Sequence, residues 1–134
     1  MRIPVIVGAT HDEQRRTPLA VTGFPASAQS YDKYLASTFG PLAPLVANEY
    51  AASAFDDPAY AAGAAASDSG IPNGIGVCPM LTELGAALAK VTTTYAYELN
   101  DPRGSAIEGF PGFEPGSLHT AEVGLLYARP VADT

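Results

Sequence analysis

Two short segments far apart in the chain carry the side chains best suited to proton transfer. The segment GATHDEQR (residues 8–15) places His11, Asp12 and Glu13 directly after the apolar run IPVIV. The second segment contains His119. These two histidines are the only ones in the sequence, and histidine most readily accepts and returns a proton near neutral pH. The two segments are therefore the candidates for acid–base chemistry.

The elements that precede these segments are expected to be parallel strands. Residues 3–9 (IPVIVGA) are rich in β-branched residues and lack polar alternation, which is typical of a strand covered on both faces. Residues 92–100 (TTTYAYELN) form a second candidate strand. Ligands gather beyond the carboxyl ends of strands in an open parallel sheet. A carboxylate at one strand end could then bind an imidazole at the next, as in the orienter–base half of a nucleophilic triad.

The rest of the chain reads as helices joined by loops rich in glycine and proline. Ser27 is a candidate helix cap and Gly40 a helix stop. Helical spacing and proline positions predict helices over residues 27–40, 41–52, 56–70, 77–91 and 118–130. Residues 101–117 are predicted to form a long loop. We therefore expect one α/β domain over residues 1–134.

Composition excludes several classes of function. The formal net charge of −7 argues against a nucleic-acid partner and against an anionic membrane surface. No window reaches the ~20 apolar residues of a membrane span, and no signal peptide is recognisable, which makes a cytoplasmic location the default expectation. The single cysteine, Cys78, rules out an internal disulfide and is expected to be a small buried hydrophobe near a helix start.

Other interpretations of the same polar residues remain open. Asp12 and Glu13 could belong to a solvated turn that places negative charge at a helix start, and His119 could be a surface residue beginning a helix. His11, Asp12, His119 and Glu122 could together ligate a metal ion. No H-E-x-x-H or C-x-x-C spacing accompanies them, so no metal site is expected. His11 is expected to be an exposed residue without a role.

Three blocks of the sequence resemble the type-B carboxylesterase family. The first, PVIVGATHDEQR, is similar to that family's P-x-x-x-G-x-x-x-D-E-G stretch. The last, PGSLHTAEVGLLYARP, is similar to its G-x-x-H-x-x-E-x-x-Y-x-F stretch. Between them, SDSGIPNGIGVCPMLTELGAALAKVTTTYAYELND resembles D-x-x-F-x-C-P-x…A-x-x-x-A…V-Y-x-Y-x-F. The blocks follow the family's order, and the chain resembles the C-terminal portion of such an esterase.

The resemblance implies the α/β-hydrolase fold, here with parallel strands, flanking helices and an incomplete sheet. The family's triad runs Ser…Glu…His along the chain. Position by position, the resemblance assigns the catalytic acid to Glu13 and the catalytic base to His119, while Glu122 matches a position that supports the histidine. Asp12 receives no role. The implied substrates are small uncharged esters, and no cofactor is implied.

The chain departs from the family pattern in ways that limit the expected activity. Gln14 replaces a glycine after the acid, Thr120 follows the histidine where glycine is frequent, and Arg129 replaces an aromatic residue. The sequence contains no G-x-S-x-G nucleophile motif. We therefore expect an acid–base portion that is inactive alone. The alternatives are a docking module for a separately encoded N-terminal portion, or a truncated remnant of such an esterase.

Overall fold

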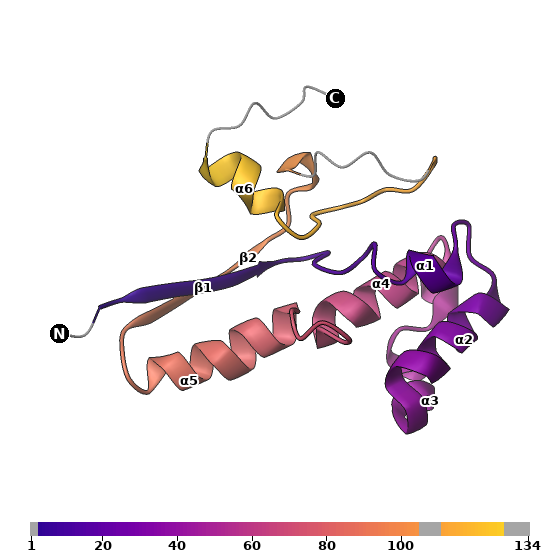
Figure 1. The fold of residues 1–134 in the computed structure, drawn as a ribbon, viewed down its shortest axis with the longest axis horizontal. Coiled ribbons are helices and arrows are strands. Elements are labelled where there is room, and N and C mark those ends of the chain that lie inside the picture. Colours follow the sequence, from indigo (N-terminus) through magenta and orange to yellow (C-terminus); the bar gives the residue numbers. More distant parts are fainter. Residues whose placement is uncertain (1–2, 105–110, 128–134) are drawn as a thin grey trace.

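The computed structural model describes residues 3–104 and 111–127, which form a mixed α/β structure with a two-stranded parallel sheet (Figure 1). Its main elements are β1 (Val5–Thr10), α1 (Leu19–Thr22), α2 (Ala28–Phe39), α3 (Ala43–Glu49), α4 (Pro58–Ser69), α5 (Gly85–Ala89), β2 (Thr94–Leu99) and α6 (Ala121–Leu126). The shorter turns of helix are η1 (Gly40–Leu42), η2 (Ala52–Ala54), η3 (Pro79–Leu84) and η4 (Pro102–Gly104). The expected combination of parallel strands with flanking helices is confirmed at this level.

The parallel pairing of β1 and β2 brings the carboxyl ends of both strands to the same end of the sheet. Val5 lies opposite Thr94, and Thr10 lies opposite Leu99. The backbone N–H of His11 extends the ladder by donating to the carbonyl of Leu99 at 2.8 Å. The chain therefore leaves β1 and β2 side by side, and the polar segments that follow them start from neighbouring positions.

Helices α5 and α6 lie on opposite sides of the two strands (Figure 1). On the α5 side, Val7 is buried and its side chain lies next to Gly85 of α5. On the other side, the Tyr97 ring lies over Gly8, which has no side chain to exclude it. Ile6 nevertheless stays 66% exposed. The expectation of a strand covered on both faces is thus wrong for β1, because the described elements shield only part of the α6 side.

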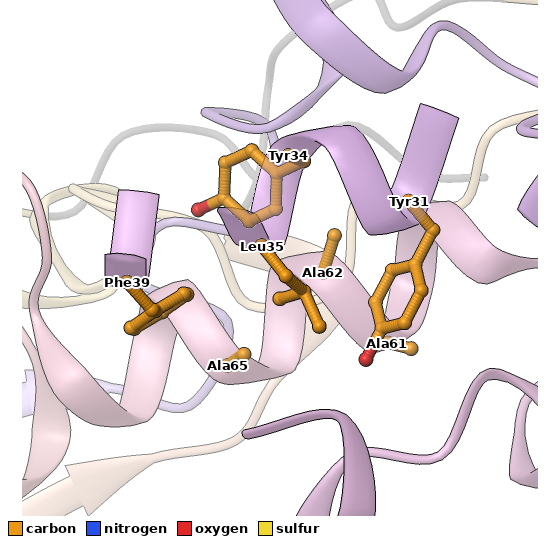
Figure 2. Close-up of a cluster of buried hydrophobic side chains, with 7 residues drawn as sticks. All are labelled: Tyr31, Tyr34, Leu35, Phe39, Ala61, Ala62 and Ala65. Carbon is orange, nitrogen blue, oxygen red and sulfur yellow. The ribbon is translucent and has the colours of Figure 1, made fainter. Parts of the chain in front are cut away.

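The main hydrophobic cluster lies away from the sheet, between α2 and α4 (Figure 2). Large side chains of α2 pack against the small side chains of α4, and the buried members are Tyr31, Tyr34, Leu35, Phe39, Ala61, Ala62 and Ala65. Alanines on α4 leave room for the large side chains of α2, so the two helices can pack closely against each other. This cluster fixes α4, and α4 in turn supports the turn that follows β1.

Local capping sets the ends of α2, as its sequence predicts, and also the ends of α4. The Ser27 hydroxyl accepts a hydrogen bond from the Ser30 N–H at 3.1 Å, and α2 ends at Gly40. The Asp57 carboxylate accepts from the Ala59 N–H at 2.8 Å. Gly70 then ends α4 in the left-handed region, with φ of 70°.

A second cluster ties the glycine-rich loop to the helical part of the molecule. Phe113 is buried among aromatic rings, with its ring centre 5.3 Å from that of Phe24 and 5.5 Å from that of Tyr60. The Tyr60 hydroxyl also accepts a hydrogen bond from the Glu114 N–H at 3.0 Å. The described end of the predicted 101–117 loop is therefore anchored just before His119.

Three sequence expectations need correction or lie partly outside the described residues. The predicted helix over residues 77–91 is not regular, because its first part, η3, has π-helical hydrogen bonding before α5 begins. Cys78 is exposed rather than buried. The last helix is shorter than residues 118–130, and Arg129, like part of the 101–117 loop, lies outside the described residues.

Candidate active site

Glu13 lies in the turn that follows β1, and its carboxylate is buried. Only 4% of the side chain is exposed. One carboxylate oxygen, Oε2, accepts two hydrogen bonds from Thr10, from the backbone N–H at 2.8 Å and from the hydroxyl at 2.6 Å. Hydrogen bonds to a charged acceptor offset the cost of burying it. Thr10 thereby fixes the orientation of Glu13 and leaves Oε1 for another partner.

That partner is His119, which lies immediately before α6. Nδ1 of the imidazole and Oε1 of Glu13 form a hydrogen bond. Since a carboxylate can only accept, Nδ1 carries the hydrogen and Nε2 is the ring nitrogen left to receive a proton. The His119 side chain is 60% exposed. A buried carboxylate thus orients an imidazole that solvent can reach.

The backbone leading from His119 into α6 adopts an unfavourable conformation. Thr120 has φ of 74°, the single positive φ at a non-glycine among the described residues. β-Branched residues rarely occupy this left-handed region, because the side chain crowds the backbone there. Glycine, which the resemblance favours after the histidine, would occupy it without strain. The departure noted in the sequence therefore has a structural cost, although it leaves the Glu13–His119 hydrogen bond in place.

Glu122 lies in the first turn of α6, near the sheet. One of its carboxylate oxygens is buried without a hydrogen-bond partner in the described part of the chain. The residue lines a cavity of about 570 Å³, mostly apolar, whose other walls include Tyr97, Leu125 and Leu126. Burial raises the pKa of Tyr97, and the charges of Glu122 and Glu13 add to that effect. No described hydrogen bond joins Glu122 to His119.

His11 is exposed, as expected, but it has a partner. Its Nδ1 lies 2.6 Å from Oε1 of Glu98, at the carboxyl end of β2. His11 therefore belongs to a separate surface pair and does not contact Glu13. Within residues 3–104 and 111–127, no group of three His, Cys, Asp or Glu side chains is placed to hold a metal ion.

Sequence reasoning missed the residues that hold the turn after β1 in place. Gln14, noted there only as a departure, is buried. Its backbone N–H donates to the Ser67 hydroxyl at 3.0 Å, and its side chain bonds the Ile75 carbonyl and the Asn73 amide. The sequence shows only that Gln14 carries an amide side chain among charged residues. That pattern does not identify hydrogen-bond partners more than 50 residues away in the chain.

Comparisons with protein-family models, with curated proteins and with solved structures give no match to this chain. None of the helices in the described part of the chain has the length and apolar character needed to cross a membrane.

Proposed function

We propose that this chain supplies the acid and the base of a serine carboxylic-ester hydrolase, with Glu13 as the acid and His119 as the base. The observation that carries the proposal is their hydrogen bond, in which a buried carboxylate meets Nδ1 of a solvent-accessible imidazole. The resemblance to type-B carboxylesterases supports the same assignment, because it names both residues independently of any geometry.

The proposed chemistry follows from the proton inventory of this pair. Nε2 of His119 takes the proton of a serine hydroxyl as its oxygen attacks the ester carbonyl, and returns that proton to the departing alcohol. A water molecule then replaces the alcohol and releases the acid by the same route. Glu13 keeps the ring in the required tautomer and stabilises the imidazolium that forms. The proposed substrates are small uncharged esters.

The proposal places the serine and the oxyanion-binding amides on another polypeptide segment, because this sequence holds neither a G-x-S-x-G motif nor a Gly-Gly run. Without them the chain lacks both the nucleophile and the donors that stabilise the oxyanion. We therefore expect no hydrolysis of p-nitrophenyl acetate by the purified chain alone.

The test is complementation with a nucleophile-bearing portion of a type-B esterase, truncated before its own acid. The mixture should hydrolyse p-nitrophenyl acetate, while the same mixture made with His119→Ala or Glu13→Gln should lose at least about 100-fold, the usual contribution of a positioned base. His11→Ala is the matched control, because it removes an exposed histidine that does not contact Glu13. Equal turnover with the His119→Ala chain would refute the assignment.

A second candidate is a non-catalytic docking module, and the exposure of the sheet favours it. Ile6 and Tyr95 lie opposite each other in the parallel register, and they are 66% and 61% exposed. Exposed apolar side chains on a two-stranded sheet are typical of a surface that another chain covers. If the chain is a docking module, the wild-type, Glu13→Gln and His119→Ala chains should all bind the nucleophile-bearing portion equally well. None of these mixtures should then hydrolyse the ester.

A further inference from the structure

Asp12 connects the turn after β1 to the segment that leads into His119. Its backbone N–H donates to the Ser117 carbonyl at 3.0 Å, and its carboxylate oxygen Oδ2 accepts from the Ser117 N–H at 2.8 Å. Asp12 also forms an isolated parallel bridge with Leu118. The two segments thus run side by side for a short distance, although 105 residues separate Asp12 from Ser117 in the sequence.

This pairing determines which side chains meet next. Glu13 follows Asp12, and His119 follows Leu118, so one step along each parallel segment brings the carboxylate to the imidazole. A displacement of Ser117 or Leu118 relative to Asp12 would therefore shift His119 relative to Glu13. The register between the two segments is therefore what sets the Glu13–His119 distance.

Neighbouring groups hold the Asp12 carboxylate in a fixed orientation. Its second oxygen, Oδ1, accepts a hydrogen bond from the Arg15 guanidinium at 2.8 Å, and the Asp12 side chain is only 13% exposed. The guanidinium carbon of Arg15 in turn lies 4.4 Å from the centre of the Tyr60 ring. Tyr60 stacks on Phe113, which lies in the same loop as Ser117. Arg15 thus links the Asp12 carboxylate, through Tyr60, to Phe113 in that loop.

Gly116 leaves the space that this arrangement requires. Its φ of 64° suits glycine, and a Cβ at this position would clash with Oδ2 of Asp12. Any larger residue would push the carboxylate away from the Ser117 N–H. The site therefore depends on close approach between Asp12 and the backbone of residues 116–117.

We propose that Asp12 is a positioning residue, which sets the register that places His119 against Glu13. Asp12 contacts neither the imidazole ring of His119 nor the reacting atoms, and it acts through Ser117 and Leu118. The inference rests on the proposed function for its catalytic meaning. The contact that it controls, however, can be measured in the chain alone.

The test is NMR spectroscopy of the isotope-labelled 134-residue chain, observing the Nδ1 proton and the ring nitrogens of His119. In Asp12→Asn, an amide NH₂ replaces one acceptor and must face a donor, either Ser117 N–H or Arg15. We expect the hydrogen-bonded Nδ1 proton signal to be lost and the ring nitrogen shifts to approach those of Glu13→Gln. Asp32→Asn is the control of equal charge change, since Asp32 is exposed on α2. It should leave the His119 signals unchanged.

Gly116→Ala provides a second variant that leaves every charge in place. It should cause the same loss of the His119 signal by displacing the Asp12 carboxylate. Retention of the wild-type His119 signals in a folded Asp12→Asn chain would overturn the proposal. If that variant does not fold, Gly116→Ala is judged by the same criterion, and failure of both to fold would also overturn it, because Asp12 would then support the whole fold rather than the pair.

These outcomes are separable from failure of the proposed function. Complementation that yields no turnover, together with loss of the His119 signal in Asp12→Asn, would refute the hydrolase assignment and leave the positioning role intact. Turnover that depends on His119, together with an unchanged signal in Asp12→Asn, would do the reverse.

Discussion

Thr10 directs both of its polar hydrogens to a single oxygen of Glu13, the backbone N–H at 2.8 Å and the hydroxyl at 2.6 Å. Thr10 itself has no exposed surface. The last residue of β1 thus closes a small ring of hydrogen bonds with the residue three positions later. This ring turns the other oxygen of Glu13 toward His119.

Replacing Thr10 with valine should destabilise the chain by about 1.5–3 kcal/mol, because a buried carboxylate loses one charge-assisted hydrogen bond while the side-chain shape is kept. Thr10→Ser keeps the hydroxyl and is the matched control, and it should lose less. Urea unfolding monitored by circular dichroism measures both free energies of unfolding. Equal losses in the two variants would show that the hydroxyl of Thr10 does not stabilise Glu13.

Thr120→Gly should raise the free energy of unfolding by about 1 kcal/mol. The φ of 74° at this position strains a β-branched residue, and glycine adopts it without a steric cost. Thr120→Ala is the control, because it removes the branch but still carries a Cβ in the left-handed region, and it should gain less. Thermal and urea unfolding would report the difference. A glycine variant less stable than wild type would argue against strain at Thr120.

Leu35→Ala should cost about 2–5 kcal/mol, since it opens a cavity between α2 and α4 in a cluster that has little freedom to collapse. Leu35 is only 2% exposed, whereas Leu45 on α3 is 69% exposed. Leu45→Ala, which makes the same chemical change at the surface, should cost well under 1 kcal/mol. Urea titrations of both variants test the comparison, and similar costs would contradict the packing shown in Figure 2.

Alkaline pH should destabilise the helical part of the chain. Burial raises the pKa of Tyr50 far above its ordinary value of 10, and the hydrogen bond that its hydroxyl donates to Asp68 adds to the effect. A group whose pKa is higher in the folded state contributes stability that is complete below its unfolded value and is lost as the pH rises above it. The free energy of unfolding should therefore begin to fall as the pH approaches the unfolded value of about 10, and it should keep falling as the pH rises further.

Tyr50→Phe is the variant that isolates this contribution. It should be less stable at neutral pH by about 1 kcal/mol, through loss of the hydrogen bond to Asp68, and its stability should fall less steeply above pH 10. Burial also raises the pKa of Tyr31 and Tyr34, so some slope should remain. A slope identical to wild type would show that Tyr50 does not carry the alkaline sensitivity.

Asp101 should titrate at unusually low pH. Hydrogen bonds from the Arg103 side chain and backbone lower its pKa from an ordinary 3.8 to about 2. A carboxyl with a depressed pKa contributes its stabilisation above the ordinary value and loses it as the pH falls toward 2. Carboxyl carbon NMR should place the midpoint near 2, and Arg103→Gln should return it toward 3.8. An unchanged midpoint in that variant would refute the pairing.

Much of the local structure could be predicted because it depends on neighbours in sequence. Ser27 and Gly40 act on backbone groups within a few residues, so their types alone mark the ends of α2. The strands could be located from their composition. The exposure of Ile6 could not be predicted, because burial depends on which other elements cover the strand. The pattern of residues 3–9 contains no information about those elements.

In the candidate site, too, some features could be predicted from the sequence and others could not. Glu13 and His119 were identified through motif resemblance, and their contact was an expectation that the structure shows as a hydrogen bond. The contribution of Asp12 depends on a backbone segment 105 residues away, which no local pattern specifies. Thr120 adopts a left-handed backbone conformation that threonine disfavours, so residue propensities predict a different conformation at this position.

The unequal exposure of Glu13 and His119 also determines how the site can be probed chemically. The His119 side chain is 60% exposed, whereas the Glu13 side chain is only 4% exposed. A water-soluble acylating or alkylating reagent can therefore reach the imidazole ring but not the carboxylate. Covalent labelling of the native chain at this site should therefore fall on the ring of His119. The carboxylate becomes available to such reagents only when the turn after β1 opens.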